Sequence, residues 1–118
     1  IEGVYANRNI YWDQLNLPNH GLIPNLPEGS IVEVPGMATG AGVKGLGMGP
    51  LPEGIAELCR RELAYSSVAV DASYHGDKDL LLQALLLDPT INDIQTAREV
   101  LDHLLTEFDE YLPQFHKG

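Results

Sequence analysis

Residues 9–34 read NIYWDQLNLPNHGLIPNLPEGSIVEV, and this stretch decides the fold of the first half of the chain. Residues 9–17 are rich in aromatic and branched apolar side chains, which predicts a strand with one buried face. Prolines and glycines then set the backbone angles of two turns. Residues 30–34 predict a second strand, which Pro35 should end because proline has no amide proton for a ladder. The two strands are expected to pair antiparallel.

The segment that follows, residues 36–49, holds six glycines in fourteen residues and is predicted to be an irregular loop. Residues 40–45 read GAGVKG and match the glycine fingerprint of dinucleotide-binding folds, which requires a strand, a tight turn and a helix in succession. Pro35 separates the motif from the strand, and Pro50 after it opposes a helix. A flexible glycine loop is therefore the preferred interpretation, and no cofactor site is assigned.

The second half of the chain has the period of helices. Proline and glutamate at positions 52 and 53 favour the start of a long helix. Apolar residues at helical spacing form one stripe that is predicted to be buried, namely Ile55, Cys59, Leu63, Val70 and Tyr74. Gly76 is a typical helix end, and Asp77 is a typical N-cap for the helix that follows.

Two shorter helices are predicted after Asp77. Residues 78–87 are apolar almost all round, which predicts a buried helix, and the Asp88–Pro89 pair ends it because the residue before proline avoids helical angles. Thr90 with Asp93 resembles a capping box at the start of the last helix. The apolar period then runs to Pro113, and it predicts that Leu104 faces the core.

The predicted fold is therefore a single α+β module. It comprises a small antiparallel β unit in residues 1–35, a glycine-rich loop in residues 36–51 and about three helices in residues 52–113. The length of 118 residues suits one compact domain, and the hydrophobic content of 44% is sufficient for a core.

Charge and cysteine content limit the partners and the compartment. Seventeen acidic residues against seven basic ones give a net charge of −10, which repels nucleic acid and anionic membrane surfaces. No apolar run approaches the roughly 20 residues of a membrane span. The single cysteine allows no intrachain disulfide, so a cytoplasmic location is expected. The chain begins with Ile1, as expected of a piece of a longer protein.

No residue is assigned as catalytic, cofactor-binding or metal-ligating. The four histidines share no helical i, i+4 pair, and Cys59 has no nearby cysteine or histidine, so Cys59 is interpreted as a small core residue. His103 is expected on a solvated helix face and His116 in a frayed tail. Ser66 and Ser67 lie within a helix rather than on the strained turn of a hydrolase nucleophile.

A cluster of polar turn residues forms the one candidate pocket lining: Asn16, Asn19, His20 and Asn25, close to Glu33 on the second strand. Asparagines in turns most often bind their own backbone. Loops also carry many binding residues. Both interpretations remain open from the sequence.

The order of the short motifs resembles the C-terminal region of glycoside hydrolase family 4. The resemblance rests on NLPNHGLIPNLP at residues 16–27, VEVP at 32–35, GPLP at 49–52, Gly76–Asp77, Leu87–Asp88–Pro89 and YLPQF at 111–115. Residues 36–49 depart from the family, which usually has Gly-Ile-x-Pro there. The resemblance implies the C-terminal domain of a two-domain enzyme that is built on an upstream NAD-binding domain.

The resemblance also implies a chemistry. Family members oxidise the C3 hydroxyl of a sugar with bound NAD, remove the C2 proton, eliminate the aglycone, add water and reduce the ketone again, with the help of Mn²⁺. Their metal ligands, tyrosine base and NAD-binding glycines belong to upstream motifs, so this piece alone is expected to hold no cofactor and to be inactive.

Two further expectations concern the substrate and the assembly. Leu87–Asp88–Pro89 resembles members that act on unphosphorylated sugars, such as α-galactosidases, α-glucosidases and α-galacturonidases. A homo-oligomer that binds an α-glycoside is expected for the full-length enzyme. The alternative is a stand-alone acidic module for protein interaction or oligomerisation.

Overall fold

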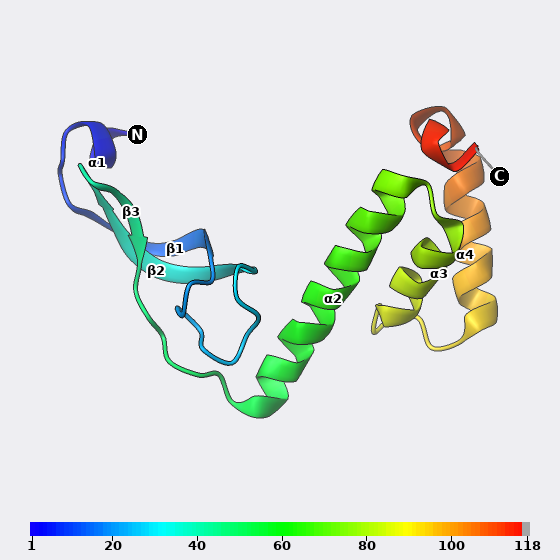
Figure 1. Ribbon diagram of the computed structural model, residues 1–118, viewed down its shortest axis with the longest axis horizontal. Coiled ribbons are helices and arrows are strands. Elements are labelled where there is room, and N and C mark those ends of the chain that lie inside the picture. The colour runs from blue at the N-terminus through cyan, green and yellow to red at the C-terminus, as the bar shows by residue number, and fades with distance from the viewer. Residues whose placement is uncertain (117–118) are drawn as a thin grey trace. The chain divides into compact units, whose positions relative to one another are not determined.

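The structure is a computed structural model that describes residues 1–116, and it has an α+β fold (Figure 1). The elements in chain order are α1 (Glu2–Tyr5), β1 (Ile10–Pro18), β2 (Ile31–Thr39), β3 (Gly42–Gly45), α2 (Glu53–His75), α3 (Lys78–Leu87), α4 (Ile94–Glu107) and two short 3₁₀ helices, η1 (Asp109–Tyr111) and η2 (Pro113–His116). A small antiparallel sheet followed by helices is the predicted class, which is confirmed. Within residues 1–116 no helix combines the length and apolarity needed to cross a membrane.

The chain divides into two compact units, Ile1–Glu57 and Leu58–Gly118. The boundary falls inside α2, so only the first turn of this helix belongs to the β unit. Chain length bounds the number of domains, but it does not show that a short sheet with its own loop can form a separate compact body.

The sheet has the order β1-β2-β3, and both pairs are antiparallel as predicted. In the β1–β2 pair, Leu15 lies opposite Val34 and Leu17 lies opposite Val32. Val32 and Val34 are buried and alternate with an exposed residue, because successive side chains of a strand point to opposite faces. These valines form the core of the first unit.

The prediction that Pro35 ends the second strand is wrong, since β2 continues through it to Thr39. The Pro35 carbonyl accepts a hydrogen bond from the Leu46 amide at 2.8 Å, so this residue faces the β3 side of the ladder. An antiparallel residue directs its amide and carbonyl to the same neighbour. The amide proton that Pro35 lacks would therefore point to the chain at the end of β3. No hydrogen bond of the ladder is lost there. A register shift in β1 between Trp12 and Leu15 lies opposite Pro35.

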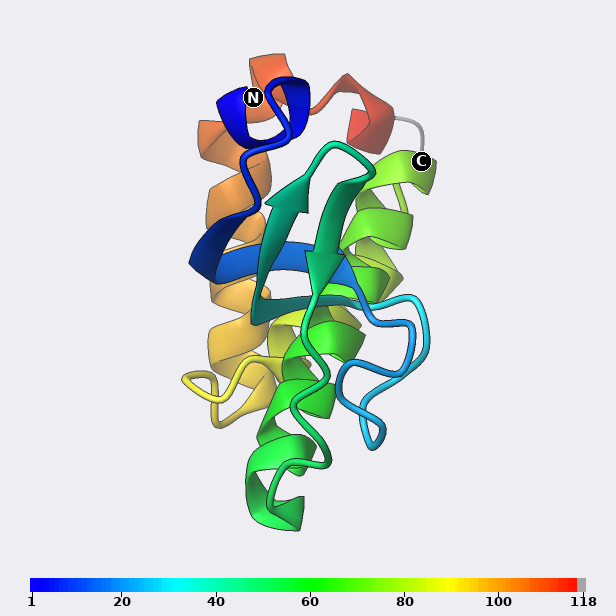
Figure 2. The same cartoon turned by 90° about the vertical axis from the view of Figure 1, so that its left-hand side faces the viewer.

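The prediction of an irregular loop over residues 36–49 is also wrong for its first ten residues. They complete β2 and form the tight hairpin to β3 that Figure 2 shows. Glycines are needed there for space: a Cβ on Gly36 would meet the Lys44 carbonyl, and a Cβ on Gly45 would lie 2.9 Å from Val34. A high glycine content thus reflects close packing within this sheet rather than irregular backbone.

The long helix α2 has the predicted bounds, and Gly76 ends it. Gly76 adopts a positive φ of 69°, and the Asp77 amide donates to the Ala72 carbonyl at 3.0 Å, as in a Schellman motif. A Cβ at Gly76 would also collide with the carbonyl oxygen of Gln114 in η2. Glycine is therefore required both for the turn and for the close approach of the C-terminal segment.

The predicted burial of the α2 stripe is wrong. Ile55, Val70 and Tyr74 are 51%, 67% and 82% exposed, whereas the fully buried residues of this helix are Ala56 and Ala72. Helical periodicity identifies an apolar face, but it does not identify which face meets the neighbouring helices.

Helices α3 and α4 pack on each other and form the core of the second unit. Leu85, Ala97 and Leu101 are buried at their contact. Asp77 caps α3 as predicted, with its carboxylate accepting from the Leu80 amide at 2.9 Å. The expected burial of α3 on all sides holds for one side only, since Leu86 remains exposed.

Helix α4 begins at Ile94 with Asp93 as its N-cap, so the predicted capping box at Thr90 is wrong. The Asp93 carboxylate accepts from the Thr96 hydroxyl at 2.6 Å and from its amide at 2.8 Å. These bonds hold the pKa of Asp93 below its usual range, because they favour the charged form. Thr90 donates instead to Asp88 in the preceding turn, which likewise lowers the pKa of Asp88.

The segment after α4, up to His116, is more ordered than predicted. The last α-helix stops at Glu107 rather than near Pro113, and two 3₁₀ turns follow. His116 is not a frayed residue, since its Nε2 lies 2.7 Å from a carboxylate oxygen of Asp109. Phe115, one residue earlier, is buried and anchors this segment.

Leu101 and Leu104 provide a test of the helical core. Leu104 was predicted to be buried but is 37% exposed, whereas Leu101 is 8% exposed. We expect Leu101→Ala to lower the free energy of unfolding by about 2–5 kcal/mol, and Leu104→Ala by less than about half as much. Urea unfolding followed by circular dichroism measures both losses. Equal losses in the free energy of unfolding would mean that the buried face of α4 has been assigned incorrectly.

Gly76 and Gly54 form a second matched pair. Gly76→Ala should destabilise the chain by more than about 1 kcal/mol, because alanine disfavours a positive φ and its methyl group would meet Gln114. Gly54→Ala, in the first turn of α2 with open space around it, should stabilise the chain by up to about 1 kcal/mol. Thermal unfolding of both variants checks that the two changes in stability have opposite signs.

Candidate functional site

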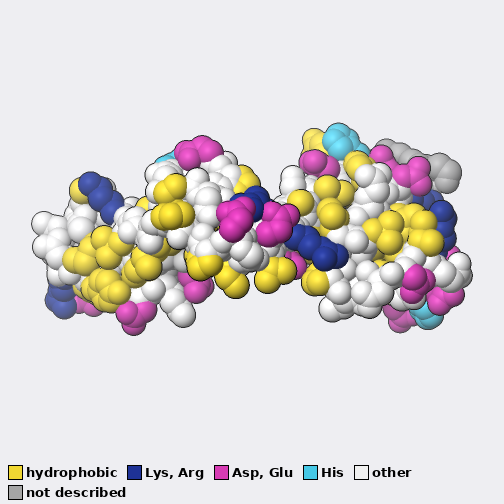
Figure 3. Space-filling model, turned by 90° about the horizontal axis from the view of Figure 1, so that it is seen from below, with side chains coloured by type: hydrophobic (Ala, Val, Ile, Leu, Met, Phe, Trp, Pro, Cys, Tyr) yellow, Lys and Arg dark blue, Asp and Glu magenta, His cyan; other side chains and the backbone are white. Residues whose placement is uncertain are grey.

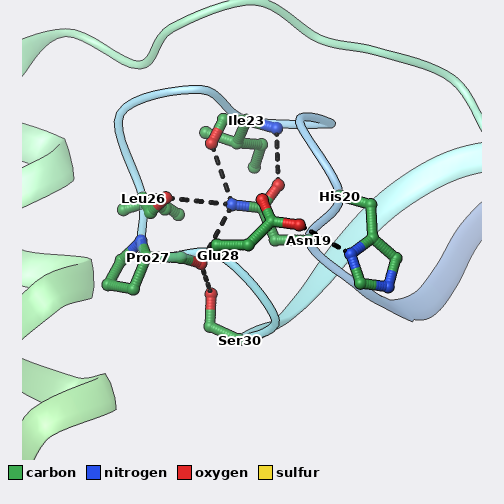
Figure 4. Close-up of polar contacts among 7 residues, drawn as sticks. All are labelled: Asn19, His20, Ile23, Leu26, Pro27, Glu28 and Ser30. Atoms are coloured by element: carbon green, nitrogen blue, oxygen red, sulfur yellow. Dashed lines mark hydrogen bonds and ion pairs between the residues drawn. The ribbon is translucent and has the colours of Figure 1, made fainter.

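The loop between β1 and β2 is built around the side chain of Asn19, which is 1% exposed (Figure 4). Its Nδ2 donates to the carbonyls of Ile23, Leu26 and Pro27 at 3.0, 3.1 and 3.2 Å. Its Oδ1 accepts from the Ile23 amide at 2.9 Å. A proline-rich turn offers few backbone donors of its own, so a buried amide side chain satisfies the backbone groups instead.

Backbone bonds close the two ends of this loop. The Asn19 amide donates to the Ser30 carbonyl at 2.7 Å, and the Gly29 amide donates to the Asn19 carbonyl at 2.9 Å. The Ser30 hydroxyl donates to the Pro27 carbonyl at 2.7 Å. The loop is therefore a rigid extension of the β1–β2 pair.

Asn25 joins the same loop to the residues before α2. Its Nδ2 donates to the Leu51 carbonyl at 2.9 Å, and its Oδ1 accepts from the Leu51 amide at 2.9 Å. The same Nδ2 lies 3.4 Å from a carboxylate oxygen of Glu53. An asparagine side chain that pairs with both backbone groups of one residue acts like one rung of a sheet, and it sets the point at which the helix begins.

An open hollow of about 370 Å³ lies beside the loop in the first unit. It is lined by Leu17, Pro18, His20, Leu22, Val43, Lys44 and Gly45. The His20 Nδ1 lies 2.7 Å from a carboxylate oxygen of Glu28, and both side chains are largely exposed (Figure 4). A mostly apolar floor with one imidazole and one ammonium group suits a polar molecule with an apolar face.

The four predicted pocket residues have different surroundings. His20 lines the hollow, whereas Asn19 and Asn25 bind backbone groups, and Asn16 lies opposite Glu33 on an exposed part of the sheet. Lys44 was not identified as a candidate, although it lies within the GAGVKG motif. Its position opposite Met37 in the β2–β3 ladder became evident only from the register.

The described residues do not fit a metal or dinucleotide site. Among residues 1–116, no three histidine, cysteine or carboxylate side chains lie close enough together to hold a metal ion. The GAGVKG motif spans the β2–β3 hairpin, so the strand, turn and helix of a dinucleotide fingerprint are not assembled around it.

Comparison with known proteins identifies the class. Residues 1–91 match the family 4 glycosyl hydrolase C-terminal domain. The α-galactosidase of Rhizobium meliloti is 34% identical and the probable 6-phospho-β-glucosidase of Bacillus subtilis 33% identical, each over 98% of this chain. This chain covers 24% and 26% of those two proteins.

Solved structures agree with this assignment. A crystal structure of a 6-phospho-α-glucosidase from gut microorganisms, in complex with NAD and glucose-6-phosphate, has a TM-score of 0.87 at 26% identity, over 96% of this chain and 25% of that one. Its complex with NAD and Mn²⁺ gives a TM-score of 0.85 at 26% identity, over 92% and 25% of the two chains. The fold is that of a C-terminal glycosidase domain.

The chain belongs to glycosyl hydrolase family 4, in its C-terminal domain. It spans about a quarter of the length of the relatives that it matches. The remainder of such a relative is therefore about three times as long as the part that matches this chain.

Asn19 provides a test of the loop. Asn19→Ala removes four hydrogen bonds from a buried position and leaves backbone groups unsatisfied, so we expect a loss of about 2–3 kcal/mol in the first unit. The exposed Asn16→Ala should change stability by less than about 0.5 kcal/mol. The fluorescence of Trp12, the single tryptophan of the chain, reports on β1 during urea unfolding. Equal effects of the two variants would disprove the structural role of Asn19.

Proposed function

We propose that this chain is the substrate-side C-terminal part of a NAD- and Mn²⁺-dependent glycosidase that cleaves unphosphorylated α-glycosides. The observation that carries the proposal is the agreement of sequence and fold over nearly the whole chain with glycosidases of family 4. The related 6-phospho-α-glucosidase was solved with NAD and with Mn²⁺, which supports the same cofactors here.

The proposed role of this chain is structural: it supports the substrate side of the active site. The redox and metal chemistry belongs to the upstream part of the enzyme. Asn19 and Asn25 hold the β1–β2 loop rigid, and that rigidity supports a role as a wall beside the substrate. The isolated chain is accordingly proposed to be inactive.

Two features support an unphosphorylated α-glycoside as the substrate. Leu87–Asp88–Pro89 resembles the family members that act on such sugars, and the Rhizobium α-galactosidase is among the similar relatives.

The cellular setting is proposed on related grounds. A chain with one cysteine needs no oxidising compartment, and a dependence on NAD suits the cytoplasm. Assembly of the full-length enzyme into a homo-oligomer is part of the same proposal, supported by large apolar side chains that the β unit exposes, among them Trp12 and Met48.

An assay of the full-length enzyme tests the proposal. Nitrophenyl α-galactoside, α-glucoside and their 6-phosphates are offered with NAD, Mn²⁺ and a reductant. We expect turnover of the unphosphorylated α-glycosides by the full-length enzyme and none by the 118-residue chain. Exclusive turnover of a 6-phosphate would contradict the proposed substrate. Turnover by the 118-residue chain would contradict the proposal that the chemistry belongs to the upstream part of the enzyme.

A further inference from the structure

The side chains of His20 and Glu28 form an exposed pair on the loop between β1 and β2. The His20 Nδ1 lies 2.7 Å from a carboxylate oxygen of Glu28, and the two side chains are 72% and 71% exposed. An exposed ion pair contributes little to the stability of a fold. The loop is held by the buried Asn19 side chain instead. The stability of the loop therefore does not account for this pair.

Backbone hydrogen bonds hold the two residues of the pair opposite each other. The Gly29 amide donates to the Asn19 carbonyl at 2.9 Å, and the Asn19 amide donates to the Ser30 carbonyl at 2.7 Å. The His20 amide donates to the Pro18 carbonyl at 3.0 Å. The imidazole is thus held through its backbone and through its ring before any ligand binds. Such preorganisation lowers the conformational entropy that binding costs.

The pairing leaves one ring nitrogen of His20 for a ligand. An ionised carboxylate only accepts hydrogen bonds, so Nδ1 carries the proton that lies between the two side chains. In the neutral ring, Nε2 is then an acceptor. Figure 4 shows Nε2 on the side of the ring away from Glu28, and no hydrogen bond joins it to a residue within the described range 1–116. A hydroxyl group of a ligand is a suitable donor to this nitrogen.

The hollow beside His20 has the size and the floor of a site for a sugar ring. Its volume of about 370 Å³ lies within the roughly 300–1,000 Å³ of small-molecule sites. Leu17 and Leu22 are half-buried and pack against Gly45, since a Cβ on that glycine would lie 3.0 Å from the Cδ1 of each leucine. This apolar floor suits the C–H groups of a sugar ring, whose hydroxyl groups then reach His20.

The charges around the hollow favour an uncharged ligand. Lys44 lines the hollow and the Glu28 carboxylate lies beside it at the His20 ring, so the two signs offset each other. Acidic and basic side chains also lie interspersed on the face of the molecule shown in Figure 3. A phosphate or carboxylate ligand would require an excess of positive charge, whereas a sugar without such a group does not.

We propose that the hollow binds the leaving sugar of an α-linked disaccharide, with a ring hydroxyl donating to Nε2 of His20 and with Glu28 positioning the imidazole. This inference rests on the proposed function, in which the chain forms the substrate side of a glycosidase. A ring that reacts must be shielded from water. Pro18, His20 and Val43 around the hollow are exposed, so the hollow suits the ring that is released.

Histidine footprinting of the full-length enzyme with NAD and Mn²⁺ tests the site directly. Diethyl pyrocarbonate acylates accessible imidazole nitrogens, and mass spectrometry of the peptides gives a rate for each histidine. The probe is D-glucose, because it is the leaving sugar of maltose and melibiose and has no glycosidic bond to cleave. At about ten times its dissociation constant, glucose should slow the acylation of His20 by ~10-fold. The rate of His103, which is exposed on α4, should stay the same and is the internal control.

Variant kinetics test whether the site is used during turnover. Melibiose has a leaving sugar, whereas nitrophenyl α-galactoside has none; maltose and nitrophenyl α-glucoside form the second such pair. His20→Ala should lower the ratio of kcat/KM for the disaccharide to that for the nitrophenyl glycoside by about 3- to 10-fold, because one hydrogen bond is lost. His20→Gln, whose side-chain amide reaches the place of Nε2, should restore part of this loss. His103→Ala is the matched control, and it should leave the ratio unchanged.

Two results would overturn the proposal. One is an acylation rate of His20 that stays within about twofold at every glucose concentration, which includes a histidine that the rest of the enzyme already covers. The other is a ratio within about twofold of the wild type for His20→Ala, in a protein with the wild-type circular dichroism spectrum. The two proposals fail separately. Turnover of unphosphorylated α-glycosides without protection of His20 refutes only the sugar site, and protection in an enzyme that cleaves only 6-phosphates refutes only the proposed substrate.

Discussion

The first unit depends on one buried amide. The Asn19 side chain satisfies an amide and three carbonyls of the loop between β1 and β2, and without it these groups would be buried unpaired or the loop would open to water. Because the loop ends are bonded to each other, the same residue also holds Pro18 opposite Ile31 in the ladder. The position of the neighbouring hollow and its His20 follows from this arrangement.

The second unit depends on a comparable constraint at Gly76. Only glycine combines its positive φ with contact to the Gln114 carbonyl, so one residue turns the chain from α2 into α3 and admits the C-terminal segment with Phe115. Both Asn19 and Gly76 lie in motifs through which the sequence resembles family 4. These motifs preserve geometry in a domain that shows no cluster of metal ligands among its described residues.

In the proposed function, this domain contributes to catalysis through the position of its loops and helix ends. Rigid loops and helix ends can hold the walls of a site to within fractions of an ångström, which is what catalysis requires of the groups around a substrate.

The sequence alone determined the class of the fold, the helix ends at Gly76 and Asp88, the cap at Asp77 and the family, because these depend on local backbone preferences and on short motifs. It could not determine that β2 runs through Pro35, that residues 36–45 pair as a hairpin, that Asp93 rather than Thr90 caps α4, or that Asn19 turns inward while His20 faces the hollow. The tertiary structure decided each of these outcomes. Strand pairing, the choice of the buried face and the nearest hydrogen-bond acceptor are fixed only after distant segments of the chain have come together.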